Sequence, residues 1–95
     1  MRRPLAPEKI AEGLLLLRGW IQDNNCITKL YQFSDYHAVM AFVNATAWIS
    51  HQHDHHPELQ VGYNTCRIHY TTHDAGGLTR KDFDCAAAID ALFRP

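Results

Sequence analysis

The sequence predicts an α+β domain of two layers, in which a four-stranded antiparallel sheet carries three helices on one face. Patterns typical of helices and strands follow one another in the order helix, strand, strand, helix, strand, strand, helix. Strands in consecutive pairs favour antiparallel pairing, and the helices between the pairs then cover one face of the sheet. A chain of 95 residues has the length of one domain, so residues 1–95 are expected to form a single unit.

The first helix is expected within residues 7–20. Pro7 suits the first position of a helix, where its missing N–H costs no hydrogen bond. Ile10, Leu14 and Leu17 follow at the spacing of one helical face. This segment therefore predicts a short helix that packs through one apolar stripe.

Residues 34–53 predict the longest helix, which Ser34 or Asp35 can cap. Its core-facing stripe consists of Val39, Phe42, Val43, Thr46 and Ile49. Pro57 is expected to stop this helix no later than the residue before it. His53 is expected on the core-side half of the helix.

Strand patterns occupy residues 20–33 and residues 58–72. The first pair surrounds a turn made by Asp23, Asn24 and Asn25, which are residue types that tolerate unusual backbone angles. In the second pair the side chains alternate, with Cys66, Ile68 and Tyr70 on one face and Arg67, His69 and Thr71 on the other.

Composition excludes several classes of function. The net charge is −1 with the histidines neutral, which is unlike the basic surface of a nucleic-acid-binding protein. No apolar run approaches the ~20 residues of a membrane span, and the start of the chain has no apolar segment typical of a secretory signal. The three cysteines, Cys26, Cys66 and Cys85, form no CxxC pair and are expected to be small buried side chains. These features predict a cytoplasmic protein.

The segment HQHDHHPE, residues 51–58, contains four of the seven histidines. His51 and His55 have the i, i+4 spacing that lets two imidazoles share a metal ion, but there is no HExxH motif and no paired cysteines. Histidines at a solvated helix end are the simplest interpretation for His51 and His53. His55 and His56 differ, because they precede the corner enforced by a proline.

His73 stands at the end of a strand and before a Gly-Gly loop, where functional groups are common. Histidine has an unperturbed pKa of ~6.5, which suits proton transfer near neutrality. His55, His56 and His73 converging on one pocket would therefore form an acid/base site, and no metal is expected.

Other candidates have both a structural and a functional interpretation. Thr79 and Asp82 form a capping-box pattern for a last helix over residues 79–93, so Asp82 is either a cap or a site residue. Trp20 is either a core residue or a ring facing a pocket, and Tyr63 is expected to be buried on one side with its hydroxyl on a polar partner.

At this point the chain resembles a known family. The segment HQHDHHPELQVGYNTCRIHYTTHDAGGLTRKD is similar to the signature of the pterin-4a-carbinolamine dehydratases. The signature positions are taken here by His51, His55, His56, Pro57, Tyr63, His73 and Asp82. Members also have a short N-terminal helix ending in Gly-Trp, which is Gly19-Trp20 here. Many members carry an acidic residue where this chain has His51.

The resemblance implies a hydro-lyase activity. These enzymes remove water from a 4a-hydroxytetrahydropterin and give a quinonoid dihydropterin, with no metal and no other cofactor. Their substrate arises when aromatic amino acid hydroxylases use a tetrahydropterin, so the enzyme supports tetrahydropterin recycling.

The resemblance also implies roles for residues. His55 and His73 would be the acid and the base, in an order that the sequence leaves open, and His56 would position the substrate. Trp20 would pack on the pterin, and Asp82 would orient His73 or bind a polar edge of the ring. His51 and Tyr63 are the remaining predicted substrate-binding residues.

A homo-oligomer, either dimer or tetramer, is expected from the resemblance and from the two open edges of the sheet. A second hypothesis is a non-catalytic adaptor, because animal members of the family assist dimerisation of a homeodomain transcription factor. A third is a metal-storage or metal-sensing domain that uses the histidine-rich segment.

Overall fold

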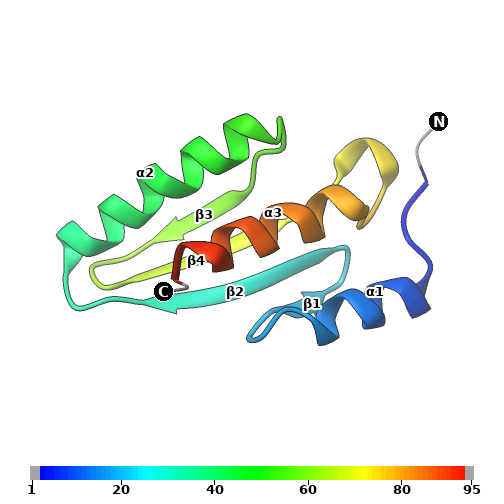
Figure 1. The fold of residues 1–95 in the computed structure, drawn as a ribbon, viewed down its shortest axis with the longest axis horizontal. Helices are drawn as coiled ribbons and strands as arrows, with labels where there is room; N and C mark the ends of the chain where they lie inside the picture. The colour runs from blue at the N-terminus through cyan, green and yellow to red at the C-terminus, as the bar shows by residue number, and fades with distance from the viewer. Residues whose placement is uncertain (1–2, 94–95) are drawn as a thin grey trace.

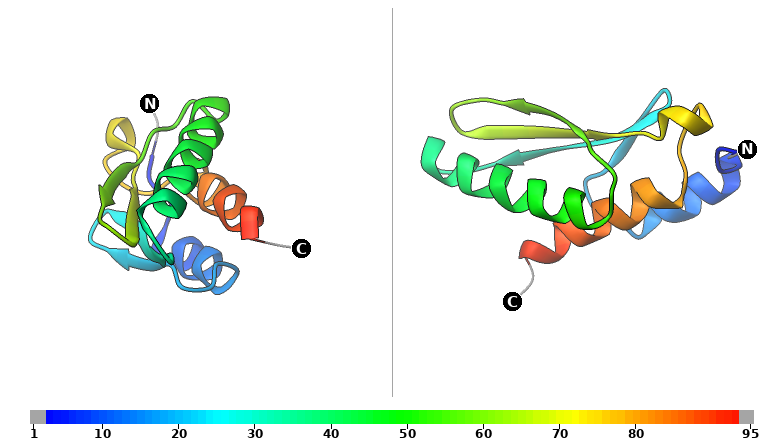
Figure 2. Two further views of the ribbon diagram at one scale, coloured as in Figure 1. Left: turned by 90° about the vertical axis from the view of Figure 1, so that its left-hand side faces the viewer. Right: turned by 90° about the horizontal axis from the view of Figure 1, so that it is seen from above.

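Antiparallel pairing of four strands forms the middle of the molecule. The computed structural model describes residues 3–93. The strands are β1 (Ile21–Asp23), β2 (Cys26–Gln32), β3 (Glu58–Val61) and β4 (Thr65–Tyr70), and the helices are α1 (Pro7–Leu15), α2 (Tyr36–Gln52) and α3 (Arg80–Asp90). The strands lie in the order β1-β2-β4-β3, and every neighbouring pair is antiparallel (Figure 1). The three helices lie on one side of the sheet (Figure 2, right), which confirms the predicted two-layer α+β fold.

Strand β4 shows why the sheet has one buried face. Its alternate residues Cys66, Ile68 and Tyr70 have no exposed surface, whereas Arg67 and His69 between them are partly exposed. The buried set faces the helices and joins the core that they cover. The predicted alternation along this strand is therefore confirmed.

The predicted turn of the first hairpin is also confirmed. Asp23 pairs with Cys26, so two residues connect the strands. Asn24 has a φ of 56°, in the left-handed region that asparagine tolerates better than most residues. Asp23, which the sequence placed in the turn, is the last residue of β1.

Helix α2 begins where the sequence predicts, but Pro57 is not what ends it. Of the two candidate caps, Asp35 is the one used: its carboxylate accepts a hydrogen bond of 2.8 Å from the Ala38 backbone N–H. The predicted core-facing stripe is correct, because four of its residues are buried and Val43 packs against the core.

The helix ends in a Schellman motif in which Asp54, with a φ of 51°, takes the place usually held by glycine. The His55 N–H donates to the Ser50 carbonyl at 3.0 Å, and the Asp54 N–H donates to the His51 carbonyl at 3.1 Å. The helix therefore ends before Pro57 acts on it. The expectation that His53 lies on the core side is wrong, because His53 is the exposed cap residue of this motif.

The segment between β4 and α3 is more ordered than the predicted loop. Thr72 pairs with Gly77 across it, and a single 3-10 turn, His73–Ala75, ends at Gly76 with a φ of 73°. Thr79 and Asp82 then form the predicted capping box at the start of α3. Within residues 3–93, no helix has both the length and the apolarity to cross a membrane.

Replacing Asp35 by Ala should remove the side-chain cap of α2 and lower the free energy of unfolding by about 1 kcal/mol. For a domain of this size that corresponds to a fall of roughly 4–8 °C in the melting temperature. Ser34→Ala is the matched control, because the cap residue is Asp35 and Ser34 precedes it. Thermal unfolding followed by circular dichroism measures both, and equal melting temperatures for the two variants would contradict this assignment of the cap.

Candidate active site

The end of α2 turns His55 back into the protein. Because the Schellman motif reverses the chain at Asp54, the next side chain lies against the sheet and only 8% of His55 is exposed. Its ring stacks on Tyr70 of β4, with 5.6 Å between ring centroids and 12° between planes. The Tyr70 hydroxyl in turn lies 2.8 Å from Ser50 Oγ in α2. The ring of His55 therefore has a fixed position.

Asp82 is a completely buried carboxylate that contacts this ring. Its Oδ1 lies 2.5 Å from His55 Nε2. Its Oδ2 accepts hydrogen bonds from Thr72 Oγ1 at 2.8 Å and from the Thr79 backbone N–H at 2.9 Å. The capping interpretation of Asp82 is confirmed through Oδ2, and Oδ1 contacts the ring of His55. The expectation that Asp82 orients His73 is corrected: it holds His55.

This contact decides which nitrogen of His55 can exchange a proton. A carboxylate accepts hydrogen bonds, so the proton between the two groups belongs to Nε2–H. Nδ1 is then the nitrogen that can gain or lose a proton without breaking the bond to Asp82.

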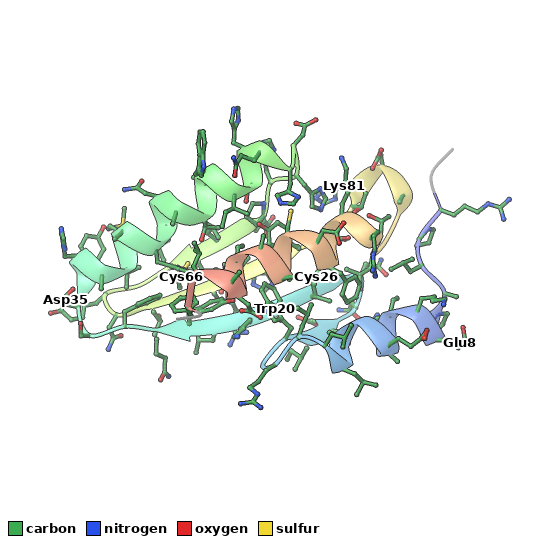
Figure 3. The ribbon with its side chains drawn as sticks, in the orientation of Figure 1. Glu8, Trp20, Cys26, Asp35, Cys66 and Lys81 are labelled. Carbon is green, nitrogen blue, oxygen red and sulfur yellow. The ribbon has the colours of Figure 1, made fainter. Side chains whose placement is uncertain are left out.

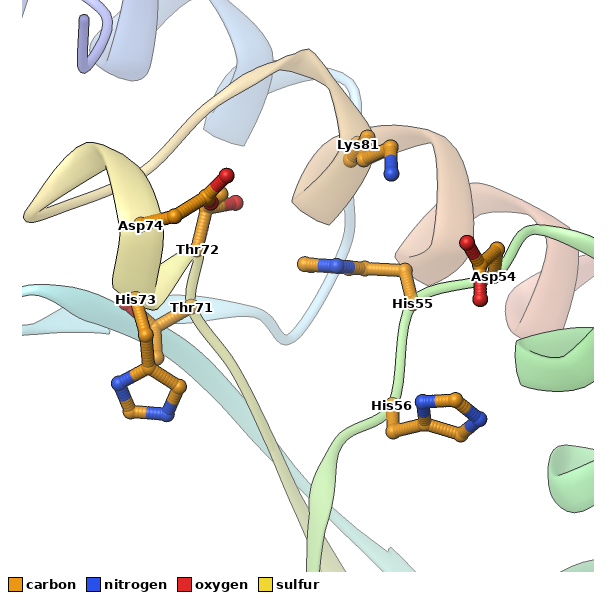
Figure 4. A pocket seen from close by; sticks show the side chains of 8 residues that line it. All are labelled: Asp54, His55, His56, Thr71, Thr72, His73, Asp74 and Lys81. Carbon is orange, nitrogen blue, oxygen red and sulfur yellow. The ribbon is translucent and has the colours of Figure 1, made fainter. Parts of the chain in front are cut away.

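His56 and His73 complete a surface pocket that we call the histidine hollow. It is lined by Asp54, His55, His56, Thr71, Thr72, His73, Asp74 and Lys81. His55 and His56 reach it from the segment after α2, whereas His73 reaches it from the 3-10 turn after β4 (Figure 4). His56 and His73 are exposed, unlike His55. The structure therefore brings together the three histidines that the sequence singled out.

Asp82 contacts His55 from behind, and none of the four predicted substrate-binding residues lines the hollow itself. Trp20 is 4% exposed in the core, where its Nε1–H donates to Asp90 Oδ2 at 3.0 Å. His51 is exposed on the last turn of α2 beside Trp48, because that face of the helix points away from the sheet. Tyr63 is 70% exposed in the turn between β3 and β4, so its expected burial is wrong.

Sequence reasoning missed Lys81 as a lining residue, and it missed the contact between Cys26 and His69 beside the hollow. Lys81 projects from the first turn of α3 (Figure 3) and borders the histidine hollow. Cys26 and His69 lie on the open face of the sheet, with 3.7 Å between Cys26 Sγ and His69 Nδ1. Strand alternation placed His69 on this face. The pairing of β2 with β4, which no local pattern shows, brings it to Cys26.

The cysteine thiols are not activated. Burial raises the pKa of the Cys26 thiol, and the carboxylates of Asp23, Glu58 and Asp82 raise it further. Burial likewise raises the pKa of Cys66, and that of Cys85 to about 11. Among residues 3–93, no three histidine, cysteine or acidic side chains are arranged to hold a metal ion. Proton exchange by imidazoles is the chemistry that these residues offer.

The fold and the hollow define a small α+β protein in which three histidines line one hollow beside the sheet. The sequence profile described as Pterin 4 alpha carbinolamine dehydratase matches residues 3–92. The chain therefore belongs to the pterin 4 alpha carbinolamine dehydratase family, as the resemblance suggested.

Relatives agree with this assignment. A protein of Nitrosospira multiformis, named provisionally as a pterin-4-alpha-carbinolamine dehydratase, is 52% identical over 91 residues, which cover 96% of this chain and 80% of the relative. A protein of Chromobacterium violaceum with the same provisional name is 50% identical over 96% of this chain and 84% of its own length.

Solved structures share the fold. A transcriptional coactivator/pterin dehydratase from Brucella melitensis has a TM-score of 0.90 at 28% identity, over 95% of this chain and 98% of its own. A pterin dehydratase-like protein identified as a RuBisCO assembly factor in the alpha-carboxysome has a TM-score of 0.67 at 24% identity. It covers 79% of this chain and 89% of its own, and this likeness concerns the fold alone.

Asp82→Ala should lower the free energy of unfolding by roughly 3–5 kcal/mol, because it removes the acceptor of the buried His55 imidazole, the buried Thr72 hydroxyl and the half-buried Thr79 N–H. Asp84→Ala is the matched control on the same helix. Asp84 is exposed and its ion pair with Arg80 is long, at 3.8 Å, so its loss should cost less than about 1 kcal/mol. Urea unfolding measures both, and equal losses would contradict the structural role of Asp82.

Proposed function

We propose that this protein dehydrates a 4a-hydroxytetrahydropterin to a quinonoid dihydropterin by general acid/base catalysis. One observation carries the proposal: three imidazoles line a single hollow, and a buried carboxylate holds one of them by one ring nitrogen. Family membership supports a pterin as the substrate.

The reaction needs two proton transfers. The C4a–O bond breaks as the hydroxyl leaves as water, while N5 loses its proton and a C4a=N5 double bond forms. A base must take the proton from N5 and an acid must give one to the hydroxyl. His55 and His73 enter the hollow from two different segments, so they can reach two different atoms of one substrate.

The three histidines have different surroundings, which suggests different roles. His55 is buried and its ring is oriented by Asp82, as expected for a group that must hold one nitrogen at a fixed place relative to the substrate. His73 is exposed at the opposite side of the hollow and can exchange its proton with water. His56 is exposed next to His55 and is assigned to positioning the ring. Which of His55 and His73 is the acid and which is the base stays open.

The reaction places the enzyme after a tetrahydropterin-dependent hydroxylation. We propose that it supports tetrahydropterin recycling for an aromatic amino acid hydroxylase in the cytoplasm, and that no metal or other cofactor takes part. We also propose a homo-oligomer, because β1 and β3 are the edges of the sheet and open edges tend to be paired or blocked.

A second candidate function is that of a protein-binding adaptor with the same fold. The name of the Brucella structure, which joins coactivator and dehydratase, favours keeping this candidate. An adaptor would bind its partner without needing the histidine set. Wild-type protein that binds a dihydropterin but does not accelerate dehydration would favour the adaptor.

Single substitutions should distinguish the roles of the three histidines in the reaction. His55→Ala and His73→Ala should each lower kcat by ~10²–10⁴-fold, the usual contribution of an acid/base group. His56→Ala should act more through KM, because it removes a positioning contact. The double variant at His55 and His73 should lose less than the product of the two single losses. The assay follows, by absorbance, a freshly generated 4a-hydroxytetrahydropterin against its spontaneous decay.

His53→Ala is the matched control, since His53 lies in the same segment but caps α2 and is exposed. It should leave kcat nearly unchanged. If a folded His53→Ala protein were as impaired as His55→Ala, this division of roles would be wrong.

Activity should survive exhaustive chelation, because imidazoles alone are proposed to move the protons. The dehydration rate is measured before and after treatment with EDTA or phenanthroline. Loss of activity with chelator and its recovery with zinc would contradict the acid/base mechanism and favour a metal-binding domain.

Light scattering at micromolar concentration should give a mass of at least twice the 10.9 kDa chain. The physical reason is the pair of open sheet edges. A monomer under these conditions would contradict the proposed homo-oligomer.

A further inference from the structure

Tyr70 lies directly against the ring of His55, and the proposed reaction gives it no role. Tyr70 is completely buried at the end of β4. Its ring lies nearly parallel to the imidazole, with 12° between the planes and 5.6 Å between the centroids. Burial raises the pKa of Tyr70, so its hydroxyl stays protonated. Tyr70 therefore offers His55 an aromatic face and no group that exchanges protons near neutrality.

The hydrogen bond to Asp82 does not by itself fix the orientation of the imidazole. A histidine ring turns about the bond between Cβ and the ring, and this torsion has broad minima. In the five-membered ring, Nε2 lies closer to the axis of that bond than Nδ1 does. Turning the ring therefore moves Nε2 little relative to the Asp82 carboxylate, but it swings Nδ1 further. A second contact must hold the plane of the ring.

The face of Tyr70 supplies that contact. Offset stacking of aromatic rings is favourable beyond the area that it buries, and in a close-packed interior a stacked ring meets its neighbour when it turns. The Asp82 contact acts at the edge of the imidazole, whereas Tyr70 acts on its face, so the two contacts restrict different motions. Together they fix Nδ1, which is the nitrogen that can gain or lose a proton.

Tyr70 is itself firmly held. It lies opposite Ile27 of β2 in the register of the sheet, and its ring packs near Trp20, with 6.3 Å between the centroids. Its hydroxyl lies 2.8 Å from Ser50 Oγ in α2, in a buried hydrogen bond. The ring and the hydroxyl thus have different partners, because the ring contacts His55 and the hydroxyl connects β4 to α2.

We propose that Tyr70 is a positioning residue of the candidate active site: the face of its ring holds the imidazole of His55 in the plane from which Nδ1 exchanges protons. The hydroxyl of Tyr70 and its bond to Ser50 serve the stability of the fold and not the reaction. This inference rests on the proposed dehydratase function and deepens it. Tyr70 does not line the histidine hollow, so it acts through His55 and not on the substrate.

The test compares two substitutions of Tyr70. Tyr70→Leu removes the aromatic face and should lower kcat by about ten- to a hundredfold, as expected for a misplaced reacting group. Its KM should stay within about threefold of the wild-type value, because no substrate contact is removed. Tyr70→Phe keeps the face and should retain kcat within about threefold. Its melting temperature should still fall by roughly 4–8 °C, because the buried Ser50 hydroxyl loses its partner.

Two matched controls separate position from stability. Ser50→Ala removes the same hydrogen bond from the other side and should behave like Tyr70→Phe. Ile68→Ala removes buried volume two residues earlier on the same face of β4, away from the histidine hollow. It should lower the melting temperature and keep kcat within about threefold. All rates are measured at a temperature at which circular dichroism shows each variant folded. If Tyr70→Leu does not fold, Tyr70→Met takes its place, because its flexible side chain refills the space without a ring.

Nuclear magnetic resonance tests the position of the imidazole without turnover. In the wild-type protein, the carbon-bound ring protons of His55 should give one sharp set of signals and nuclear Overhauser effects to the ring protons of Tyr70. The loss of these signals in His55→Gln assigns them. Tyr70→Phe should keep both features, because the ring remains. In Tyr70→Leu the His55 signals should broaden or double, because the imidazole turns among several orientations.

The outcomes separate this inference from the function on which it rests. If the Leu and Phe variants keep kcat equally or lose it equally, or if Ile68→Ala lowers kcat as much as Tyr70→Leu, the positioning role is overturned and the dehydratase function stands. If the wild-type protein shows no Overhauser effect between the two rings, the positioning role is overturned as well. If the wild-type protein does not accelerate dehydration, the proposed function fails, and the resonance spectra still decide whether Tyr70 holds His55.

Discussion

The buried carboxylate of Asp82 is the contact on which the candidate site depends. It joins three segments of the chain: the turn after α2 through His55, the segment after β4 through Thr72, and the start of α3 through the Thr79 N–H. A buried charge is costly unless it is fully hydrogen-bonded, and here both oxygens have partners. The hydrogen bonds that offset the cost of burying the carboxylate therefore also fix the imidazole of His55, which is proposed to transfer protons.

A second carboxylate anchors the other end of α3. Asp90 accepts hydrogen bonds from Trp20 Nε1 at 3.0 Å, Lys29 Nζ at 3.0 Å and the Tyr31 hydroxyl at 2.5 Å. An acidic residue opposes the helix dipole at a C-terminus, and Lys29 offsets this with its charge. Helix α3 is thus held to the sheet at both ends. This explains the structural position of Trp20, whose ring packs near Tyr31 and Tyr70 rather than in the histidine hollow.

The candidate site lies where secondary structure elements end. Its buried part is held firmly by packing and hydrogen bonds, and its outer part is open to solvent. His55 is stacked, hydrogen-bonded and 8% exposed, whereas His56 and His73 are exposed. A proton-transfer group must be held in position, as His55 is. Exchange with substrate and water needs exposed groups, such as His56 and His73. Beyond His56 and His73, the open face of the sheet continues through His69 and Cys26.

The sequence by itself determined the fold class, the strand faces and the identity of the three histidines, because these depend on local periodicity and on a local motif. It left Asp82 undecided between cap and site, and it assigned Trp20, His51 and Tyr63 to the substrate. Only the tertiary structure shows that Asp82 both caps α3 and contacts His55, and that the other three residues lie outside the histidine hollow. Whether a side chain reaches a hollow depends on strand register and on the reversal at Asp54, which bring residues distant in the chain together. No local pattern contains that information, so the partner of Asp82 and the pairing of Cys26 with His69 emerge only after folding.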